Sequence, residues 1–358
     1  MSPDTDTSDS TAVSTPTSRV DIGPDTVVLG IETSCDETAA ALVMGGTDVI
    51  SSVVSSQVDL HAEFGGVVPE IASRAHLELL NPVIARAIVE GGVDDRRIDA
   101  VACTVGPGLI GALLVGVSAA KALALAWDVP FVGVNHLEAH LYAALLDDPT
   151  IEFPVVVLLV SGGHTMLVEM RGHGEYRVLG RTIDDAAGEA FDKVARFLDL
   201  GYPGGPAIDA AALHGDPEAI AFPRAMLHDG LDFSFSGLKT AVVNTVRKQP
   251  DLSSDDIAAS FQAAVVDVLV AKARRAAAAV GATGIVLGGG VAANSLLREE
   301  MLGACAADGL RGFVPSRAMC TDNAAMIAAA GWYRLRADGP TPLDIGASPN
   351  LALSTLER

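Results

Sequence analysis

Two successive runs of short apolar segments, each continuing as an alternation of helices and strands, constrain this chain more than any other feature. We expect strands at residues 26–31, 39–44, 49–57, 100–105, 130–134, 154–160, 165–169, 176–181 and 284–288. Helical spacing of apolar residues occurs at 76–90, 111–127, 138–146, 189–198, 205–213, 235–247, 254–280 and 293–306. Each run opens with a meander of strands, whereas a dinucleotide-binding unit opens β-α-β. The pattern predicts an α/β chain with two lobes facing each other, linked near residues 147–153.

The composition fits two compact domains built from small aliphatic side chains. The chain has 358 residues, 49% of them hydrophobic and 4% aromatic, so Ala, Val, Leu and Ile must fill the core. Its cysteines, Cys35, Cys103, Cys305 and Cys320, are scattered without a CxxC pair, which favours reduced thiols in the cytoplasm. The apolar stretch 110–127 contains a lysine and predicts a buried helix, not a membrane span.

The charge distribution limits the kinds of partner. The formal net charge is −21, from 24 Lys and Arg against 45 Asp and Glu. Phosphate binding requires basic surface, so we do not expect this chain to coat nucleic acid by itself. Residues 1–25 are rich in Ser, Thr, Asp and Pro and lack the apolar segment of a secretory signal. We expect an acidic, disordered tail there.

A histidine pair is the first candidate for metal chemistry. His136 and His140 are four residues apart, so on a helix they share one face and can bind one metal ion. The spacing resembles HExxH, but Glu138 is third in the motif and would point roughly 160° away from the histidine face. It therefore cannot serve as the base of a zinc protease. The alternative for an isolated pair is two satisfied surface histidines.

Glycine-rich turns after apolar strands are candidates for phosphate binding. Residues 106–111 match GxGxxG, but no acidic residue closes the following strand, so a tight turn is the preferred interpretation. The turns at 161–164 and 288–290 can bring backbone N–H groups close to a phosphate. A P-loop motif is absent from the sequence.

Two polar segments interrupt apolar ones. Thr321 and Asp322 precede a helix of small residues, where either can be an N-cap. Residues 32–38 place acids and hydroxyls between the first two strands, which suits a hairpin loop. An acidic turn at that place is also where ATPases of the actin, hexokinase and Hsp70 type bind metal-phosphate.

Together these residues resemble the bacterial TsaD family, relatives of the archaeal and eukaryotic Kae proteins once described as O-sialoglycoprotein endopeptidases. The segments run in one order and cover most of the chain from Val28 to about Ala330. The matching segments are 30–38, 61–70, 72–76, 132–140, 159–165, 184–193, 201–206, 233–239, 288–294 and 321–323.

The resemblance implies a two-lobed, actin-like α/β fold of the ASKHA class, with a duplicated RNase H-like unit. Residues 26–152 with the C-terminal 323–358 would form the first lobe, and residues 153–322 the second. It also implies a transferase that moves the threonylcarbamoyl group of threonylcarbamoyl-AMP to N6 of a tRNA adenosine. That adenosine lies 3′ of the anticodon in tRNAs reading codons that begin with A, and the product is t6A.

The resemblance further implies the roles of individual residues. One divalent metal, Fe2+ or alternatively Zn2+, is expected on His136, His140 and Asp322, with positions left open for phosphate or carbonyl oxygens. The adenylate is expected on Leu159, Val160, Ser161, Gly162, Gly163, Asp192, Gly205, Asp209 and Asn294. Our own candidates for steering or deprotonating the attacking amine are Asp36 and Glu37, because they should lie beside the bound substrate.

The expected partners are tRNA, a TsaB-like paralogue that lacks the metal site, and a TsaE-like ATPase, with no membrane. The segment 57–76 carries His61, Arg74 and His76, and we expect it to help grip tRNA while partner subunits add basic surface. Three alternatives remain open. They are a metal-dependent glycoprotease, which lacks a placed glutamate base; an ASKHA-type ATPase or sugar kinase, which lacks a histidine pair; and a non-enzymatic TsaB-like scaffold, which would not need the intact metal triad.

Overall fold

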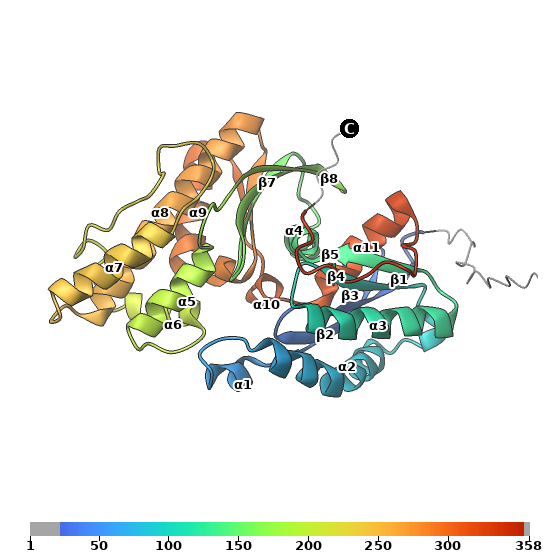
Figure 1. Ribbon diagram of the computed structural model, residues 1–358. Helices are drawn as coiled ribbons and strands as arrows, with labels where there is room; N and C mark the ends of the chain where they lie inside the picture. The colour runs from blue at the N-terminus through green and yellow to red at the C-terminus, as the bar shows by residue number, and fades with distance from the viewer. Residues whose placement is uncertain (1–21, 354–358) are drawn as a thin grey trace, which may run out of the picture.

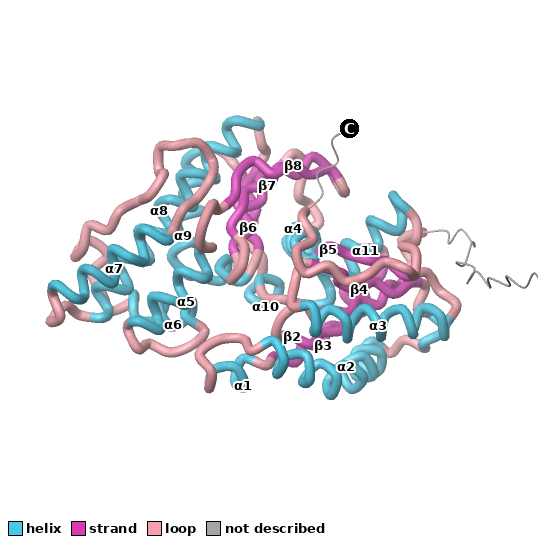
Figure 2. The backbone as a smooth tube through the Cα atoms, viewed as in Figure 1, coloured by secondary structure: helices cyan, strands magenta, loops and turns pink. Residues whose placement is uncertain are grey.

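The structure, a computed structural model, describes residues 22–353. The tail predicted at 1–25 therefore lies almost wholly outside the described residues. Two five-stranded sheets organise the described part of the chain, and each belongs to one lobe (Figures 1 and 2). The predicted division at 26–152 with 323–358, and at 153–322, is compatible with this arrangement and stays a prediction.

The two sheets have the same topology. The first has the order β3-β2-β1-β4-β5 and the second β10-β9-β6-β7-β8. In each, three antiparallel strands form a meander and two further strands join in parallel. The first sheet contains β1 (Val27–Glu32), β2 (Glu37–Met44), β3 (Asp48–Ser56), β4 (Ala100–Gly106) and β5 (Phe131–Asn135). The second contains β6 (Val155–Val160), β7 (Thr165–Gly172), β8 (Glu175–Arg181), β9 (Gly284–Gly288) and β10 (Arg311–Phe313). The duplication predicted from the sequence is confirmed.

Helices cover the outer faces of both sheets. On the first lobe, α2 (Pro69–Gly91) and α3 (Ile110–Trp127) pack on the sheet, and the short α1 (Val58–Ala62) precedes α2. On the second, α8 (Ser254–Val280) and α9 (Ser295–Asp308) pack on the sheet and α5 (Ala187–Phe197) shares their core, while α6 (Gly204–Ala212) and α7 (Ser236–Lys248) pack on α5 and α8. By length and composition α3 alone among the described helices could cross a membrane, and in the structure one of its faces packs on β4 and α2.

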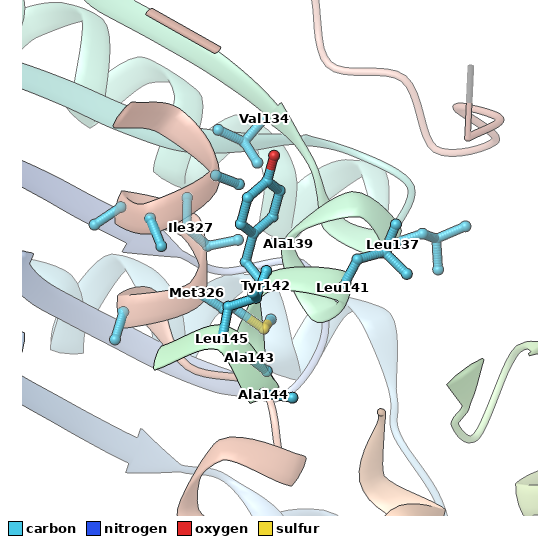
Figure 3. Packing of buried hydrophobic residues seen from close by; sticks show 14 of the residues in the cluster. Val134, Leu137, Ala139, Leu141, Tyr142, Ala143, Ala144, Leu145, Met326 and Ile327 are labelled. Carbon is cyan, nitrogen blue, oxygen red and sulfur yellow. The ribbon is translucent and has the colours of Figure 1, made fainter. Parts of the chain in front are cut away.

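The helices α4 (His136–Asp147) and α11 (Ala324–Asp338) lie between the two sheets, close to the short α10 (Arg317–Cys320). One continuous core holds their apolar faces together with side chains of both sheets (Figure 3). Tyr142 of α4 packs beside Met326 and Ile327 of α11 in this core. A shared core of this kind fixes both helices relative to the sheets.

Several boundaries differ from those predicted, for reasons of capping and packing. α4 begins at His136 instead of residue 138 because the Asn135 side chain accepts N–H bonds from the first turn. α2 begins at Pro69 instead of residue 76, and proline is favoured at the first helical position. The turn at Gly106 is filled by protein, since a Cβ there would meet the Ser348 carbonyl at 1.9 Å. This supports the tight-turn interpretation of the GxGxxG sequence.

Candidate functional site

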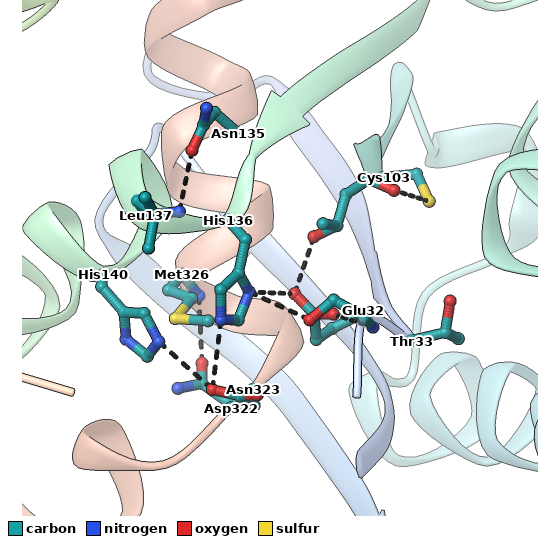
Figure 4. Close-up of polar contacts among 12 residues, drawn as sticks. Glu32, Thr33, Cys103, Asn135, His136, Leu137, His140, Asp322, Asn323 and Met326 are labelled. Carbon is teal, nitrogen blue, oxygen red and sulfur yellow. Dashed lines mark hydrogen bonds and ion pairs between the residues drawn. The ribbon is translucent and has the colours of Figure 1, made fainter. Parts of the chain in front are cut away.

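Two histidines of α4 and an aspartate just before α11 converge between the sheets (Figure 4). One ligand atom from each of His136, His140 and Asp322 lies within 4.8 Å of the other two. The Nε2 atoms of His136 and His140 lie 3.4 and 3.2 Å from Asp322 Oδ1. The N-cap of α11 is Asn323, which accepts the Met326 N–H at 3.0 Å. Asp322 is therefore not used as a cap, and its carboxylate faces the imidazoles.

The electrostatics of this triad fit a bound cation. Burial opposes the ionisation of Asp322, but the charges of His136 and His140 keep the pKa of its carboxyl far below its ordinary value. Within residues 22–353, neither ring nitrogen of the buried His140 has a hydrogen-bond partner of acceptable geometry. Its 3.2 Å contact with Asp322 has the distance of an ion pair without the angles of a hydrogen bond. Two imidazoles, one carboxylate and unsatisfied buried nitrogens suit a divalent transition metal with open positions.

Glu32, at the end of β1, orients His136, and no pattern in the sequence pointed to this role. Its Oε2 lies 3.0 Å from His136 Nδ1 and accepts from Thr104 Oγ1 at 2.6 Å. The carboxyl is fully buried, and although burial opposes its charge, His136 holds its pKa below the ordinary value. Burial also opposes the charge of His136, while Asp322 and Glu32 raise the pKa of its imidazole well above normal. A carboxylate on Nδ1 leaves Nε2 to face the metal position.

Asp36 and Glu37 lie where β2 begins, at the same corner of the first sheet. Asp36 is buried, and Glu37 Oε1 accepts a hydrogen bond from Ser56 Oγ at 3.2 Å. Burial, followed by the negative charges of Asp322 and Asp36, raises the pKa of Glu37 to about 10. The structure thus brings both acids near the triad, and without a metal Glu37 retains its proton at neutral pH.

Two side chains of the second lobe approach the site, His164 near the triad and Tyr202 near Asp36, and neither was singled out from the sequence. Burial and the charges of His136 and His140 lower the pKa of His164, which follows β6. Burial and the charge of Asp36 raise the pKa of Tyr202, which precedes α6. Both residues lie in segments that resemble the family. In those segments the sequence predicts ligand binding by the neighbouring glycines, and His164 and Tyr202 were given no role.

The glycine turn after β6 forms the second-lobe side of the site. The side chains of Leu159 and Val160 are fully buried, so only their main chain can reach a ligand. The Ser161 hydroxyl accepts the N–H of His164 at 3.2 Å. A Cβ at Gly162 or Gly163 would meet nothing within 4 Å, so the chain is open there to a closely approaching phosphate. That openness agrees with a ligand site but does not identify the ligand.

Asp192 of α5 and the start of α6 are joined directly. Asp192 Oδ1 accepts the Gly204 N–H at 2.8 Å, and a Cβ at Gly204 would meet the Asp192 Cα at 2.4 Å. A Cβ at the neighbouring Gly205 would meet nothing within 4 Å. Burial raises the pKa of the Asp192 carboxyl. Gly204 is therefore used for packing, and Gly205 is left as the open position.

Asp209 and Asn294 form a polar network at the start of α9. Asn294 Nδ2 donates to Asp209 Oδ1 at 3.1 Å and to Gln262 Oε1 at 2.7 Å. Its Oδ1 caps α9 by accepting the Leu297 N–H at 3.0 Å. Asp209 also accepts the Ser295 hydroxyl at 2.7 Å. The structure gives both residues a helix-positioning role, and ligand binding by them stays a prediction.

The segment 57–76, which we expect to help grip tRNA, keeps its two histidines inside the first lobe. His61 and His76 are fully buried. His61 Nε2 lies 3.2 Å from Gln57 Oε1, and His76 Nδ1 lies 2.8 Å from Thr38 Oγ1. Burial lowers the pKa of His76. Both histidines therefore anchor the segment to the first lobe, and of the three basic residues only Arg74 is exposed.

The fold and the site define a two-lobed, actin-like α/β protein with a candidate metal centre between its lobes. Two solved structures share the fold at low identity. Component A of (R)-2-hydroxyglutaryl-CoA dehydratase from Acidaminococcus fermentans has a TM-score of 0.54 at 13% identity, covering 87% of this chain and 99% of that one. HypF from T. kodakarensis has a TM-score of 0.62 at 15% identity, covering 89% and 49%. The chain belongs to the TsaD family, whose model, tRNA N6-adenosine threonylcarbamoyltransferase, matches residues 48–329.

Curated relatives agree with this assignment over nearly their full length. A tRNA N6-adenosine threonylcarbamoyltransferase of Symbiobacterium thermophilum is 58% identical over 330 residues, covering 91% of this chain and 97% of the relative. One of the same name from Geobacter sp. is 54% identical over 334 residues, covering 92% and 97%. The predicted family and the actin-like fold are therefore confirmed.

Proposed function

We propose that this chain transfers the threonylcarbamoyl group of threonylcarbamoyl-AMP to N6 of the adenosine 3′ of the anticodon, forming t6A in tRNAs that read codons beginning with A. Family membership supports the activity and the tRNA substrate. The observation that carries the site is the convergence of His136, His140 and Asp322 opposite the open glycine turn of the second lobe.

The adenylate is proposed to bind on the second-lobe side of the triad. Its phosphate would approach the main chain at Gly162 and Gly163, where glycine permits close contact. Its ribose would lie between Asp192 and the open Gly205, because a carboxylate accepts hydrogen bonds from vicinal hydroxyls. The mixed anhydride would then lie between the glycine turn and the triad.

His136, His140 and Asp322 would hold one divalent metal, Fe2+ or alternatively Zn2+. A 2-His-1-carboxylate set suits non-haem Fe(II), and three protein ligands with an open position also suit catalytic zinc. When bound, such an ion would polarise the substrate carbonyl or phosphate oxygens. Glu32 would keep His136 in the tautomer whose Nε2 faces that ion.

The transfer forms one bond and breaks one. The adenine N6 attacks the carbamoyl carbon, the bond from that carbon to the phosphate oxygen breaks, and AMP leaves. N6 must also lose a proton. We assign its acceptance to Asp36, because the neighbouring Glu37 carboxyl is already engaged by the Ser56 hydroxyl of β3 at 3.2 Å. Positioning by the two lobes supplies much of the rate, since adenine N6 is a poor nucleophile.

Transfer of labelled threonine from threonylcarbamoyl-AMP into tRNA tests the function and the metal together. We expect His136→Ala and Asp322→Ala to lose at least about a hundredfold in rate, while Asp36→Asn loses rate and keeps its metal. Full activity of both metal-site variants would overturn the metal proposal. A wild-type Asp36→Asn rate would overturn the assignment of the base.

Two partner subunits are proposed, a TsaB-like paralogue and a TsaE-like ATPase. The outer face of α2 and α3 supports docking of the paralogue, since Leu77, Leu114 and Leu125 are 66%, 50% and 56% exposed there. Exposed apolar side chains on neighbouring helices are typical of protein interfaces. The proposed compartment is the cytoplasm, which agrees with a tRNA substrate and four unpaired cysteines.

The glycoprotease alternative has no geometric support. Glu138 is bonded to Arg334 and turned away from the triad, so it cannot activate a metal-bound water as in HExxH proteases. A casein cleavage assay with added metal is expected to give no product. The ATPase or kinase alternative rests on fold alone, and a shared fold does not fix function.

A further inference from the structure

Glu138 is a fully buried acid that the proposed reaction does not use. It lies between the two metal-ligating histidines in sequence and on a different side of α4. Burying a carboxylate is costly unless it is paired and hydrogen-bonded. The hydrogen-bond and ion-pair partners of Glu138 therefore indicate its structural role.

Three elements from both lobes meet at this carboxylate. Arg334 of α11 donates from Nε to Glu138 Oε2 at 2.5 Å. Tyr176 of β8, in the second lobe, donates to Glu138 Oε1 at 3.2 Å. The Tyr176 hydroxyl also lies 2.7 Å from that of Tyr142, one helical turn further along α4. Glu138 thus links α4 to α11 and to the second sheet.

The two linked helices position all three metal ligands. His136 and His140 lie in the first turns of α4, and Asp322 lies two residues before α11 begins. Arg334 is ten residues beyond the first residue of α11, a distance of about 15 Å along the helix axis. α11 is therefore attached to α4 at two separate points, through the metal triad and through Glu138–Arg334. The second point opposes pivoting of α11 about the triad, in addition to the apolar core that the two helices share.

We propose that Glu138 is a positioning residue for the metal centre: paired with Arg334, it holds α4 against α11 so that His136, His140 and Asp322 keep the spacing that a divalent cation requires. Tyr176 extends the same link to the second lobe. This inference rests on the proposed metal site, and it gives the middle glutamate of the HxExH sequence a role other than catalysis.

Stability and metal affinity can be separated for such a pair. Replacing a buried ion pair by apolar residues of similar size is often neutral or stabilising, because the desolvation cost of both charges disappears. Leucine and methionine, however, pack in several rotamers and cannot reproduce the directional Glu138–Arg334 bond. The double variant Glu138→Leu/Arg334→Met should therefore fold normally and still misalign the ligands.

The experiment uses full-length protein freed of metal by a chelator, with Co2+ as the probe. Visible absorbance in competition with a chelator gives the Co2+ affinity, and the metal-free Tm is measured in parallel. We expect the double variant to bind Co2+ about tenfold more weakly at an unchanged Tm, as for other partners that orient metal ligands. His140→Ala, which removes a ligand, should abolish high-affinity binding.

Lys272→Met is the matched control. Lys272 is also a fully buried charged residue, but its Nζ donates to the carbonyl of Asp229, away from α4 and α11. It should lower the Tm and leave the Co2+ affinity unchanged. Equal Co2+ affinity of wild type and double variant would overturn this inference alone. Failure of wild type to bind Co2+ would overturn it together with the metal proposal.

Discussion

Acidic side chains around the histidine pair carry different protonation states although they share one corner of the first lobe. His136 holds the buried Glu32 carboxyl ionised against its desolvation, whereas burial and neighbouring carboxylates raise the pKa of Glu37 to about 10. Separating two nearby carboxyls in this way assigns them different tasks. Glu32 orients His136, and Glu37 is a neutral hydrogen-bonding group as long as no cation offsets Asp322.

Glu37 should make the metal-free protein less stable as the pH rises. Its folded pKa of about 10 lies above the ordinary 4.5, so between these values the folded state binds one more proton than the unfolded state. Below pH 4.5 Glu37 does not change the free energy of unfolding with pH. Between pH 4.5 and its folded pKa, that free energy declines by about 1.4 kcal/mol per pH unit, because the unfolded state releases the proton first. Urea unfolding of wild type and Glu37→Gln between pH 6 and pH 8 measures the difference.

The difference in unfolding free energy between Glu37→Gln and wild type should grow in favour of the variant as the pH increases. Adding Zn2+ should flatten this trend, because a cation beside Asp322 lowers the pKa of Glu37. Glu90→Gln is the control, since Glu90 is an exposed acid on α2 whose carboxylate pairs with the exposed Arg86. A pH-independent difference for Glu37→Gln would contradict the assigned protonation state.

At the scale of single residues, the sequence predicts a shared role for two side chains only where their spacing along the chain indicates a common face. The i, i+4 spacing of His136 and His140 indicates a shared helix face, but their third partner, Asp322, follows from the family resemblance only. Glu32 has no periodic signature, because a buried acid closing an apolar strand resembles the start of a polar loop. Its role depends on contacts with β4 and α4, which are distant in sequence.

At the scale of elements, the glycines at the start of α6 separate packing from ligand access. Gly204 is in contact with α5, whereas Gly205, its neighbour, is open. We expect Gly204→Ala to destabilise the protein by about 1–3 kcal/mol through overpacking. Gly205→Ala should leave the unfolding free energy within about 0.5 kcal/mol of wild type.

The same Gly205→Ala variant should nevertheless raise KM for threonylcarbamoyl-AMP by about tenfold, or about 1.4 kcal/mol, because its methyl group occupies space proposed for the ligand. Denaturant unfolding and initial rates at varied adenylate concentration provide the two measurements. A Gly205→Ala variant with wild-type KM would remove Gly205 from the proposed adenylate site.

Elements of this chain were predictable where burial is either continuous or periodic along the sequence. β1, β4, β6 and β9 are buried along their whole lengths, so continuous apolar runs locate them. Helix starts depend on caps. The predicted start of α4 was two residues too late, because the Asn135 cap is followed by a histidine and not by the apolar residue that the periodicity requires. β10 has three residues, too few for any periodicity to report.

At the scale of the whole molecule, a net charge of −21 conflicts with a polyanionic substrate. Phosphate contacts supply much of the affinity for nucleic acid, and this chain has few basic residues to make them. The exposed apolar side chains of α2 and α3 offer a physical solution, since a paralogue docked there can add basic surface to the first lobe. The complex of both subunits would then bind tRNA more tightly than this chain alone.

Leu114→Glu on α3 tests this argument, because a charge on the outer face of α3 should prevent docking of the paralogue without disturbing the buried face. Sedimentation with the purified paralogue should give a complex for wild type and separate species for the variant. In its mixture with the paralogue, the variant should bind tRNA only as weakly as the chain alone. The slope of log Kobs against log salt should become shallower by about 0.9 for each tRNA phosphate that is no longer neutralised by a basic side chain. Leu302→Glu on α9, where Leu302 is 45% exposed, is the control and should leave complex and slope unchanged. Binding of tRNA by the isolated chain as tight as by the assembly would show that its few local basic residues suffice despite the overall charge.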